Sequence, residues 1–433
     1  MVRRLDASAK DFDAGFAALL AKKRDTAEAV DRVAAEIVAD VRARGDAALI
    51  EHTRRLDRIE PTEATLRLSD GEIEAAAKQA PEAAVEALKL AARRIEAYHR
   101  RQIPEDEDFV DADGVRLGWR WTALDSVGLY VPGGLAAYPS SLLMNAIPAR
   151  VAGVGRLAVA MPTPEGRLNP LVCAAARLLG IDEIWRVGGA QAVAALAYGT
   201  ASIAPVDKIV GPGNAYVAAA KRLVFGQVGI DLIAGPSEIV VLADRAADPR
   251  WVAADLMSQA EHDESSQAVL IADDRELADA VDEAVARLLE TLPRRAIAAK
   301  SWADHGAILR VGNLEAGCKL VDRLAPEHVE LMVARPDTLL PRIRHAGAIF
   351  LGRHAPEALG DYVAGSNHVL PTSRAARFAS GLSVLDFVKR SSIMGCDAEA
   401  MRRIGPAAAA LAEAEGLAAH ALSVTLRLNS TKR

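Results

Sequence analysis

Two side chains that can ligate a metal stand at the end of an apolar helical stretch. WVAADLM, from Trp251, has the pattern of a helix, and Gln259 and His262 follow it in SQAEHDESS. Residues three apart lie on one face of a helix, so an amide oxygen and an imidazole nitrogen can point at one ion. For this pair alone, a solvated helix end is the simpler explanation. Further candidate ligands elsewhere in the chain would favour a metal site over a solvated helix end.

Two other segments supply candidate ligands. EALGDYVAGSNHVLP contains Asp361 and His368 among glycines, and LAEAEGLAAHALS contains Glu415 and His420 on an alanine-rich background. Taken singly, each histidine is explained as a hydrogen-bonded core residue. Taken as a set, Gln, His, Asp and His suit zinc or a similar divalent ion, since no thiolate is available.

A possible acid–base pair lies in LAPEHVELM, where Glu327 and His328 follow Pro326 between apolar flanks. Adjacent side chains diverge along a helix or strand, but a bend after the proline can bring both to one cleft. Imidazole titrates near neutral pH and suits a general base, and a carboxylate beside it can activate water. The alternative is a helix start, where the dipole favours a glutamate.

The elements that must position these residues change in character near Ser126. The first hundred residues are predicted to be mostly helical, with a capping box from Ser69 to Glu72. Further on, short β-rich runs alternate with alanine-rich helical segments, which is typical of parallel strands joined by crossover helices. The expected strands are SVGLYV, RLAVAM, EIWRV, DKIV, EIVVLA and QAVLIA. The sequence therefore predicts an α/β fold of the doubly wound class.

Glycine- and proline-rich loops stand at the ends of these strands. VPGG begins at Val131, VGG at Val187, VGPGN at Val210 and AGPS at Ala234. Ligands of open α/β sheets bind at the carboxyl ends of strands, so we expect these loops to form binding surfaces. A PGG loop by itself is usually only a turn. Neither GxGxxG nor GxxxxGK[ST] occurs, so any dinucleotide must bind without the usual glycine fingerprint.

Composition narrows the class of protein. The 433 residues suggest about two to four domains. A net charge of −6 and only 4% aromatic residues disfavour nucleic acid as a partner. Cys173, Cys318 and Cys396 are odd in number and show no CxxC spacing, which indicates a reducing cytoplasm. We expect neither a signal peptide nor a membrane span.

The motifs also match a known family in their order and spacing. The chain resembles the histidinol dehydrogenases in GLYVPGGLAAYPSSLLMNAIPARVAGV, VGGAQAVAALAYGT, VGPGNAYVAAAK, IAGPSEIVVLAD, DLMSQAEHDESSQAVL, LAPEHVELM, GDYVAGSNHVLPT and EGLAAHALSVTLR. The first hundred or so residues match only in helical character, and no functional motif position departs from the family pattern. The resemblance implies oxidation of L-histidinol to L-histidine through L-histidinal, the last step of histidine biosynthesis. It also implies one zinc ion per site and two NAD.

The resemblance assigns roles to individual residues. The implied catalytic pair is Glu327 and His328. The implied zinc ligands are Gln259, His262, Asp361 and His420. The implied substrate-binding residues are Ser237, Gln259, His262, His328, Asp361, His368, Glu415 and His420. The implied NAD contacts are Tyr130, Gln191 and Asn214.

The same resemblance implies a domain-swapped homodimer with two incomplete Rossmann-like domains and small helical terminal domains. We expect an N-terminal arm over 1–25, a first α/β domain with the catalytic and zinc residues over 26–129 and 239–380, an NAD-binding α/β domain over 130–238, and a C-terminal tail over 381–433. FVKRSSIMGCD is interpreted as a connector that lets the tail reach the partner subunit's active site with Glu415 and His420.

Three other functions are compatible with parts of the sequence. A related zinc- and NAD-dependent dehydrogenase would oxidise another small alcohol, such as a sulfonated diol, but His368 and Glu415 favour histidinol because the family's histidinol amine and ring bind there. A zinc hydrolase with Glu327 as base is disfavoured by the absence of HExxH-type spacing and by the PGG and GPGN loops. A non-catalytic binding module is disfavoured because every catalytic position is filled.

Overall fold

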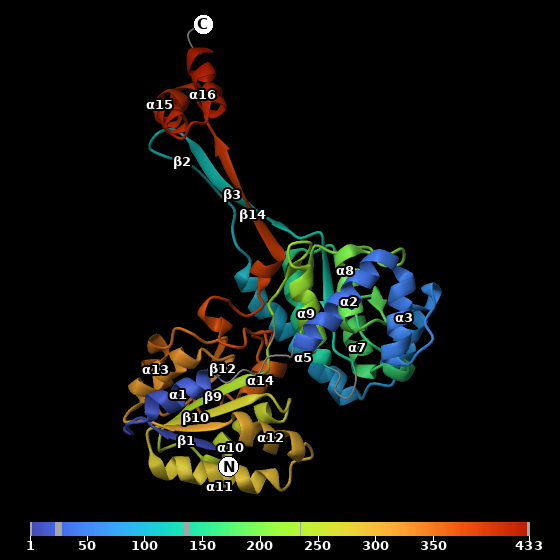
Figure 1. Ribbon diagram of the computed structural model, residues 1–433, viewed down its shortest axis with the longest axis vertical. Helices are drawn as coiled ribbons and strands as arrows, with labels where there is room; N and C mark the ends of the chain where they lie inside the picture. Colours follow the sequence, from blue (N-terminus) through green and yellow to red (C-terminus); the bar gives the residue numbers. More distant parts are fainter. Residues whose placement is uncertain (1, 22–27, 134–137, 234, 431–433) are drawn as a thin grey trace.

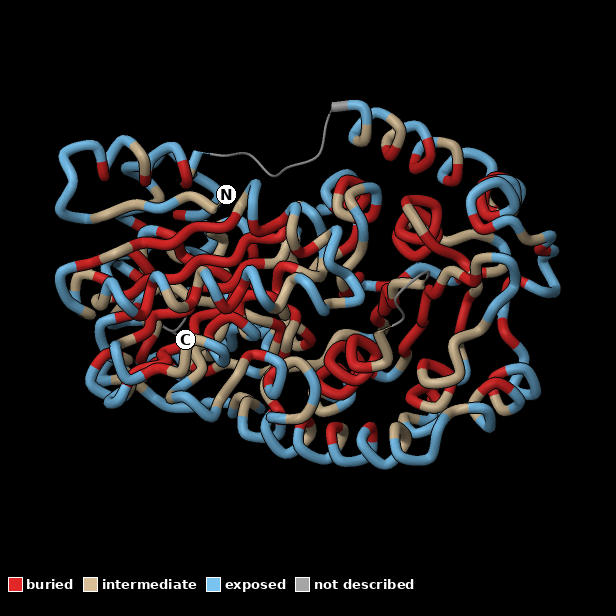
Figure 2. The backbone as a smooth tube through the Cα atoms, turned by 90° about the horizontal axis from the view of Figure 1, so that it is seen from below, coloured by how far each residue is buried: buried red, intermediate tan, exposed pale blue. Residues whose placement is uncertain are grey.

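The computed structural model describes residues 2–21, 28–133, 138–233 and 235–430. It contains two parallel β-sheets, of six and five strands, and a three-stranded antiparallel sheet (Figure 1). The central strands of both parallel sheets are buried, whereas the outward faces of the surrounding helices are exposed (Figure 2). In the described part of the chain, no helix is both long and apolar enough to cross a membrane.

The six-stranded sheet has the order β1-β11-β10-β9-β12-β13. Its strands are β1 (Arg3–Asp6), β9 (Glu238–Ala243), β10 (Gln267–Ala272), β11 (Ala307–Arg310), β12 (His328–Met332) and β13 (Ala348–Leu351). Strands β9, β10 and β12 are buried throughout, because helices cover both faces of the sheet. The helices of this unit are α1 (Phe12–Ala21), α10 (Pro249–Ala260), α11 (Arg275–Leu289), α12 (Arg295–His305), α13 (Leu314–Leu324) and α14 (Glu357–Tyr362).

The five-stranded sheet has the order β6-β5-β4-β7-β8. Its strands are β4 (Ser126–Tyr130), β5 (Arg156–Ala160), β6 (Ile184–Trp185), β7 (Lys208–Val210) and β8 (Gly229–Ile230). One face packs on α4 (Asp70–Ala77), α5 (Glu82–His99), α6 (Pro139–Ala152) and α7 (Pro170–Leu179). The other face packs on α2 (Glu28–Arg44), α3 (Asp46–Asp57), α8 (Gly189–Tyr198) and α9 (Ala215–Val224).

This packing differs from the expected domain division. Helices α2 to α5 share their cores with the five-stranded sheet, whereas we expected residues 26–129 to group with residues 239–380. Likewise β1 is an edge strand paired with β11, and not part of a separate helical arm. The physical reason is that an amphipathic pattern shows which face of a helix is buried but not which sheet it covers.

The three-stranded sheet extends away from both parallel sheets (Figure 1). Its strands are β2 (Glu107–Val110), β3 (Arg116–Ala123) and β14 (Val388–Gly395). At its far end it carries α15 (Ala398–Ala414) and α16 (Ala418–Ser430). The segment interpreted as a connector is thus mostly strand β14, which pairs along the full length of β3. The tail does leave the body of its own chain, but on a paired ribbon.

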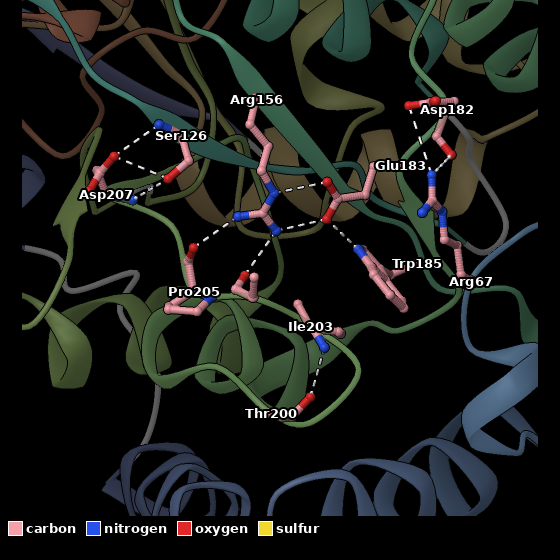
Figure 3. Close-up of polar contacts among 11 residues, drawn as sticks. Arg67, Ser126, Arg156, Asp182, Glu183, Trp185, Thr200, Ile203, Pro205 and Asp207 are labelled. Atoms are coloured by element: carbon pink, nitrogen blue, oxygen red, sulfur yellow. Dashed lines mark hydrogen bonds and ion pairs between the residues drawn. The ribbon is translucent and has the colours of Figure 1, made fainter.

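Polar side chains tie together the amino ends of the five-stranded sheet (Figure 3). Arg156, at the start of β5, donates to both carboxylate oxygens of Glu183 at 2.9 and 2.8 Å. It also donates to the carbonyl oxygens of Ala204 and Pro205. Side-chain contacts therefore hold the amino end of this sheet together, which leaves the loops at its carboxyl ends as the candidate binding surfaces.

The predicted α/β class is confirmed. The expected strands correspond to β4, β5, β6, β7, β9 and β10. The capping box at Ser69 is present as well, with Glu72 bonded back to the main chain of Ser69. The ribbon of β2, β3 and β14 was not foreseen.

Candidate active site

A cavity of about 660 Å³ lies between the two parallel sheets. The five-stranded sheet contributes the loops that follow β4 and β7, and the six-stranded sheet contributes residues at the amino ends of β9 and β12. The cavity brings together most of the residues singled out in the sequence: Asn214, Ser237, Gln259, His262, Glu327, His328, Asp361 and His368.

A buried ion pair holds the loop after β7. Lys221 Nζ donates to the carbonyl oxygen of Gly211 at 2.7 Å and to Asp231 Oδ1 at 2.6 Å. Asp231 Oδ2 accepts from the Gly211 N–H at 2.8 Å. Gly211 has a φ of +114°, and a Cβ there would lie 2.2 Å from the Tyr130 carbonyl oxygen. Both polar groups of Gly211 are therefore fixed, and only glycine fits.

The loop ends at the start of α9. Asn214 Oδ1 accepts from the N–H groups of Tyr216 and Val217 at 3.0 and 3.1 Å, as a helix N-cap does. Asn214, Ala215 and Ala218 line the cavity, so the N-terminus of α9 forms part of its wall. Helix N-termini favour anions, phosphate groups included.

The opposite wall carries candidate metal ligands. Gln259, in the last turn of α10, is 0% exposed, and neither its Oε1 nor its Nε2 has a hydrogen-bond partner among the described residues. A buried amide without partners is unfavourable unless something else binds it. His262 follows on the same wall. Burial lowers the pKa of its ring and outweighs the charge of Asp361, which raises that pKa. A neutral imidazole and an orphaned amide fit a bound cation.

Asp361, in α14, is also suited to be a metal ligand. Burial alone would raise its pKa, but the interaction with His328 and the charge of His368 lower it, so the group stays a carboxylate. Its main-chain carbonyl oxygen lies 3.0 Å from Nδ1 of His368. Nε2 of His368 is 3.3 Å from the hydroxyl of Ser141, which lines the cavity from α6. His368 thus bridges the two halves of the molecule.

Glu327 and His328 lie at the start of β12, directly after Pro326. We expected a bend at this proline to bring both side chains to one cleft, and both line the cavity. Glu327 Oε2 accepts from the Glu238 N–H at 2.9 Å. His328 Nδ1 lies 3.0 Å from the Glu238 carbonyl oxygen, to which it donates when protonated. Nε2 is then left beside Asp361 Oδ1, at 3.7 Å, with no hydrogen-bond partner among the described residues.

The pKa values of this pair are shifted strongly. Burial raises the pKa of Glu327 to about 8. Burial alone would lower the pKa of His328, but the charges of Glu327, Glu357 and Asp361 raise it to about 10. Groups perturbed by burial and by specific partners inside a cavity are typical of sites of proton transfer.

Glu357 belongs to this cluster and was missed in the sequence. It is 2% exposed, and its Oε2 accepts from the Ser258 hydroxyl at 3.1 Å. Ligand atoms of Glu357, His328 and Asp361 lie within 4.8 Å of one another, close enough to hold a metal ion. The available signal was the spacing of Glu357 and Asp361, which places both carboxylates on one face of a helix.

Four of the singled-out residues lie off this cavity. The Tyr130 hydroxyl accepts from the Gly189 N–H at 3.0 Å, and burial raises the pKa of Tyr130 to about 12. Gln191 is 1% exposed, and its amide has no partner among the described residues. Glu415, in the turn between α15 and α16, and His420, on α16, are exposed in the helical unit at the end of the ribbon (Figure 1). A single chain therefore does not assemble the full expected set.

Comparison with known proteins identifies the family. The sequence model of the histidinol dehydrogenase family matches residues 20–428. The chain is 63% identical over 430 residues to the histidinol dehydrogenase of Rhodospirillum rubrum and 61% identical over 429 residues to that of Ruegeria pomeroyi; each match covers 99% of both chains. The crystal structure of histidinol dehydrogenase from Elizabethkingia anophelis, 34% identical, matches with a TM-score of 0.95 over 100% of this chain and 99% of the other. This chain belongs to the histidinol dehydrogenase family.

Proposed function

We propose that the chain carries out the zinc-dependent, NAD-linked four-electron oxidation of L-histidinol to L-histidine through L-histidinal. Family membership supports the substrate. One observation carries the chemistry: an acid–base pair and three nitrogen or oxygen ligands share one cavity, whose opposite wall is a helix N-terminus.

The proposed zinc ligands are Gln259, His262 and Asp361, with His420 supplied by a partner subunit. The orphaned amide of Gln259 and the anionic state of Asp361 support this set. When bound, zinc would hold the nitrogen atoms of the substrate. Asp361 also raises the pKa of His328, and a cation on Asp361 would offset that charge and bring the ring nearer the neutral form that a base needs.

The proposed NAD site is the unit built on the five-stranded sheet. Asn214 and the N-terminus of α9 would face the pyrophosphate, and Tyr130 and Gln191 lie near the carboxyl ends of the same strands. NAD, when bound, supplies the hydride acceptor for each oxidation.

The chain's own residues handle the protons. Nε2 of His328 removes the hydroxyl proton, first from the alcohol and later from the aldehyde hydrate. Glu327 removes a proton from the water that adds to the aldehyde. Such general-base steps contribute about 10²–10⁴-fold each. No cysteine is among the described residues that line the cavity, which supports a hydrate and not a thiohemiacetal.

The test is the amount of NADH formed per histidinol, with and without a chelator. We expect two NADH, and no turnover after chelation until a divalent metal is restored. One NADH per histidinol would contradict the four-electron reaction. Faster turnover of another alcohol, such as a sulfonated diol, would favour the related dehydrogenase, and hydrolysis without NADH would favour a hydrolase.

We further propose a homodimer in which the C-terminal helices complete the partner subunit's site. Glu415 and His420 are exposed in the helical unit at the end of the ribbon, which leads away from the body of the chain (Figure 1). Leu411, Leu422 and Leu426 on these helices are 65%, 56% and 60% exposed. Leu422 and Leu426 are one turn apart on the same face of α16, and contiguous apolar surface of this kind is typical of a protein interface.

Subunit mixing tests this arrangement. An inactive His420→Ala chain and an inactive His262→Ala chain, refolded together, should regenerate activity. A mixed swapped dimer collects both defects in one site and none in the other, so random pairing returns about a quarter of wild-type sites. No recovery despite demonstrated heterodimers would mean that His420 serves its own subunit.

A cytoplasmic location is proposed as well. It is supported by the state of Cys173, Cys318 and Cys396, all of which are free thiols.

A further inference from the structure

One main-chain segment holds both members of the acid–base pair. Glu238, the first residue of β9, donates its N–H to Glu327 Oε2 at 2.9 Å. Its carbonyl oxygen accepts from Nδ1 of His328 at 3.0 Å. Strands β9 and β12 are neighbours in the sheet, with His328 opposite Ile239. Any displacement of Glu238 therefore displaces both side chains at once.

The side chain of Glu238 is anchored in turn. It is 4% exposed, and its Oε1 accepts from the Ser373 N–H at 3.1 Å. Slightly earlier in the same loop, the Gly235 N–H donates to Thr372 Oγ1 at 2.6 Å. A Cβ on Gly235 would lie 2.2 Å from the Ser373 hydroxyl. The loop that leads into β9 thus rests on the turn formed by residues 372–374.

That turn has an uncommon backbone. Ser373 has a φ of +53° and Arg374 a φ of +65°, so two consecutive non-glycine residues occupy the left-handed region. The Ala375 N–H closes the turn on the Thr372 carbonyl oxygen at 2.9 Å. Strained conformations of this kind persist where surrounding contacts fix them, and they cluster at functional sites. Here the strained conformation directs the Ser373 N–H at Glu238.

We propose that Glu238 is a positioning residue of the reaction. Its carboxylate, held by the turn at 372–374, fixes the main-chain groups that orient Glu327 and His328. This inference rests on the proposed roles of that pair. The rival explanation is electrostatic, because the negative charge of Glu238 also raises the pKa of Glu327. The two explanations predict different results for an uncharged side chain that keeps its oxygen.

Glu238→Gln and Glu238→Met separate them. Glutamine keeps an oxygen for the Ser373 N–H, so we expect kcat within about threefold of the parent. Methionine removes that oxygen at similar volume, and we expect kcat to fall about 10–100-fold, because a displacement of about 1 Å can cost 10²-fold. Both half-reactions should slow, with the KM values for NAD and histidinol and the metal content unchanged. A purely structural defect would not spare KM and metal content in this way.

Two further variants keep the test decisive. Thr372→Val removes the acceptor of the Gly235 N–H and should lower kcat in the same direction, by a smaller factor. Ser373→Gly keeps the N–H and tolerates a positive φ, so it should retain parental kcat as the matched control. Should Glu238→Met fail to fold, Thr372→Val decides.

Parental kcat in a folded Glu238→Met or, failing that, in Thr372→Val would overturn the inference. A loss in Glu238→Gln as large as in Glu238→Met would overturn it in favour of the electrostatic explanation. The proposed function itself is tested on the unmodified enzyme, by its substrate preference, its need for a metal and its yield of two NADH per histidinol, so the two failures are distinguishable.

Discussion

The two parallel sheets of this molecule present opposite ends to one cavity. The five-stranded sheet contributes loops that follow β4 and β7, at the carboxyl ends of its strands. The six-stranded sheet contributes Ser237, just before β9, together with Glu327 and His328, where β12 begins. Open α/β sheets ordinarily bind ligands at carboxyl ends, so only one of the two sheets follows the rule.

The difference has an electrostatic consequence. At carboxyl ends of parallel strands, helices begin, and the N-terminus of α9 at Asn214 offers the positive end of the helix dipole to an anion. At amino ends helices finish, and α10 ends at Ala260, where its carbonyl groups favour a cation beside Gln259 and His262. One half of the cavity is therefore suited to phosphates and the other to a metal ion and a base.

The largest expected effect comes from the cation half. His262→Ala should lose the metal and all measurable turnover, because the remaining ligands are too few, while NAD binding should persist. Metal analysis, NADH formation and NAD titration of the purified variant check the three parts. Glu327→Gln is the control, and it should keep its metal. Full zinc occupancy in His262→Ala would refute the ligand assignment.

Next come the two groups of the acid–base pair. His328→Ala should slow both oxidations by about 10²–10⁴-fold, because each requires a proton to leave oxygen. Glu327→Gln should spare the oxidation of histidinol and slow mainly that of histidinal, where water must be activated. Single-turnover NADH formation from each substrate separates the steps. Equal damage to both steps in Glu327→Gln would assign Glu327 a structural or electrostatic role.

These halves differ in how far the sequence could predict them. The glycine-rich loops of the five-stranded sheet are local signals, and the carboxyl-end rule correctly places Pro132 of VPGG and the PGN of VGPGN at the cavity; Gly134 of VPGG lies outside the described residues. Gln259 and His262 are likewise a local spacing. The position of Glu327 and His328 at the amino end of β12 is not a local signal, because it depends on how the two sheets face each other.

Other features could not be read from local pattern for the same reason. Strand β14 pairs with β3, which lies far away in the sequence, so FVKRSSIMGCD resembled a connector. Glu238 looks like one more residue of a buried strand until its contacts with Glu327, His328 and Ser373 are known. Long-range contacts, and not residue types, define these roles.

A moderate effect is expected in the anion half. The double variant Lys221→Met/Asp231→Leu removes the buried ion pair without leaving either charge unpaired, so the loss of stability should be limited to that of the two hydrogen bonds of Gly211, roughly 1–3 kcal/mol each. Gly211 loses both of its partners, and KM for NAD should rise about tenfold, as expected for one or two lost hydrogen bonds. KM for histidinol and metal content should stay at parental values. Arg156→Met, at the closed end of the same sheet, is the control: it should lower the melting temperature and leave KM for NAD unchanged. Equal KM values for NAD in both variants would show that the ion pair of Lys221 and Asp231 does not position the loop after β7.

No effect on turnover is expected from a change at Asp57, which belongs to the same half of the molecule, the half built on the five-stranded sheet. A variant there should change stability without changing catalysis. Asp57 ends α3, is 8% exposed, and its Oδ2 has no hydrogen-bond partner among the described residues. Burial raises its pKa from 3.8 to about 6. The folded state thus favours the neutral acid, so this stabilising contribution is complete below about pH 4 and is lost as the pH rises through about 6.

Asp57→Asn imitates the neutral acid at every pH. At pH 8 the variant should be more stable than the parent by up to about 3 kcal/mol, at 1.4 kcal/mol per pKa unit, and the difference should shrink as the pH falls to 5. Denaturant unfolding at the two pH values measures it. Asp46→Asn is the matched control, because the buried Asp46 accepts from the N–H and hydroxyl of Ser202 at 2.9 and 2.8 Å and should lose stability when changed. A gain for Asp57→Asn that is equal at both pH values would mean that its carboxyl does not titrate between them.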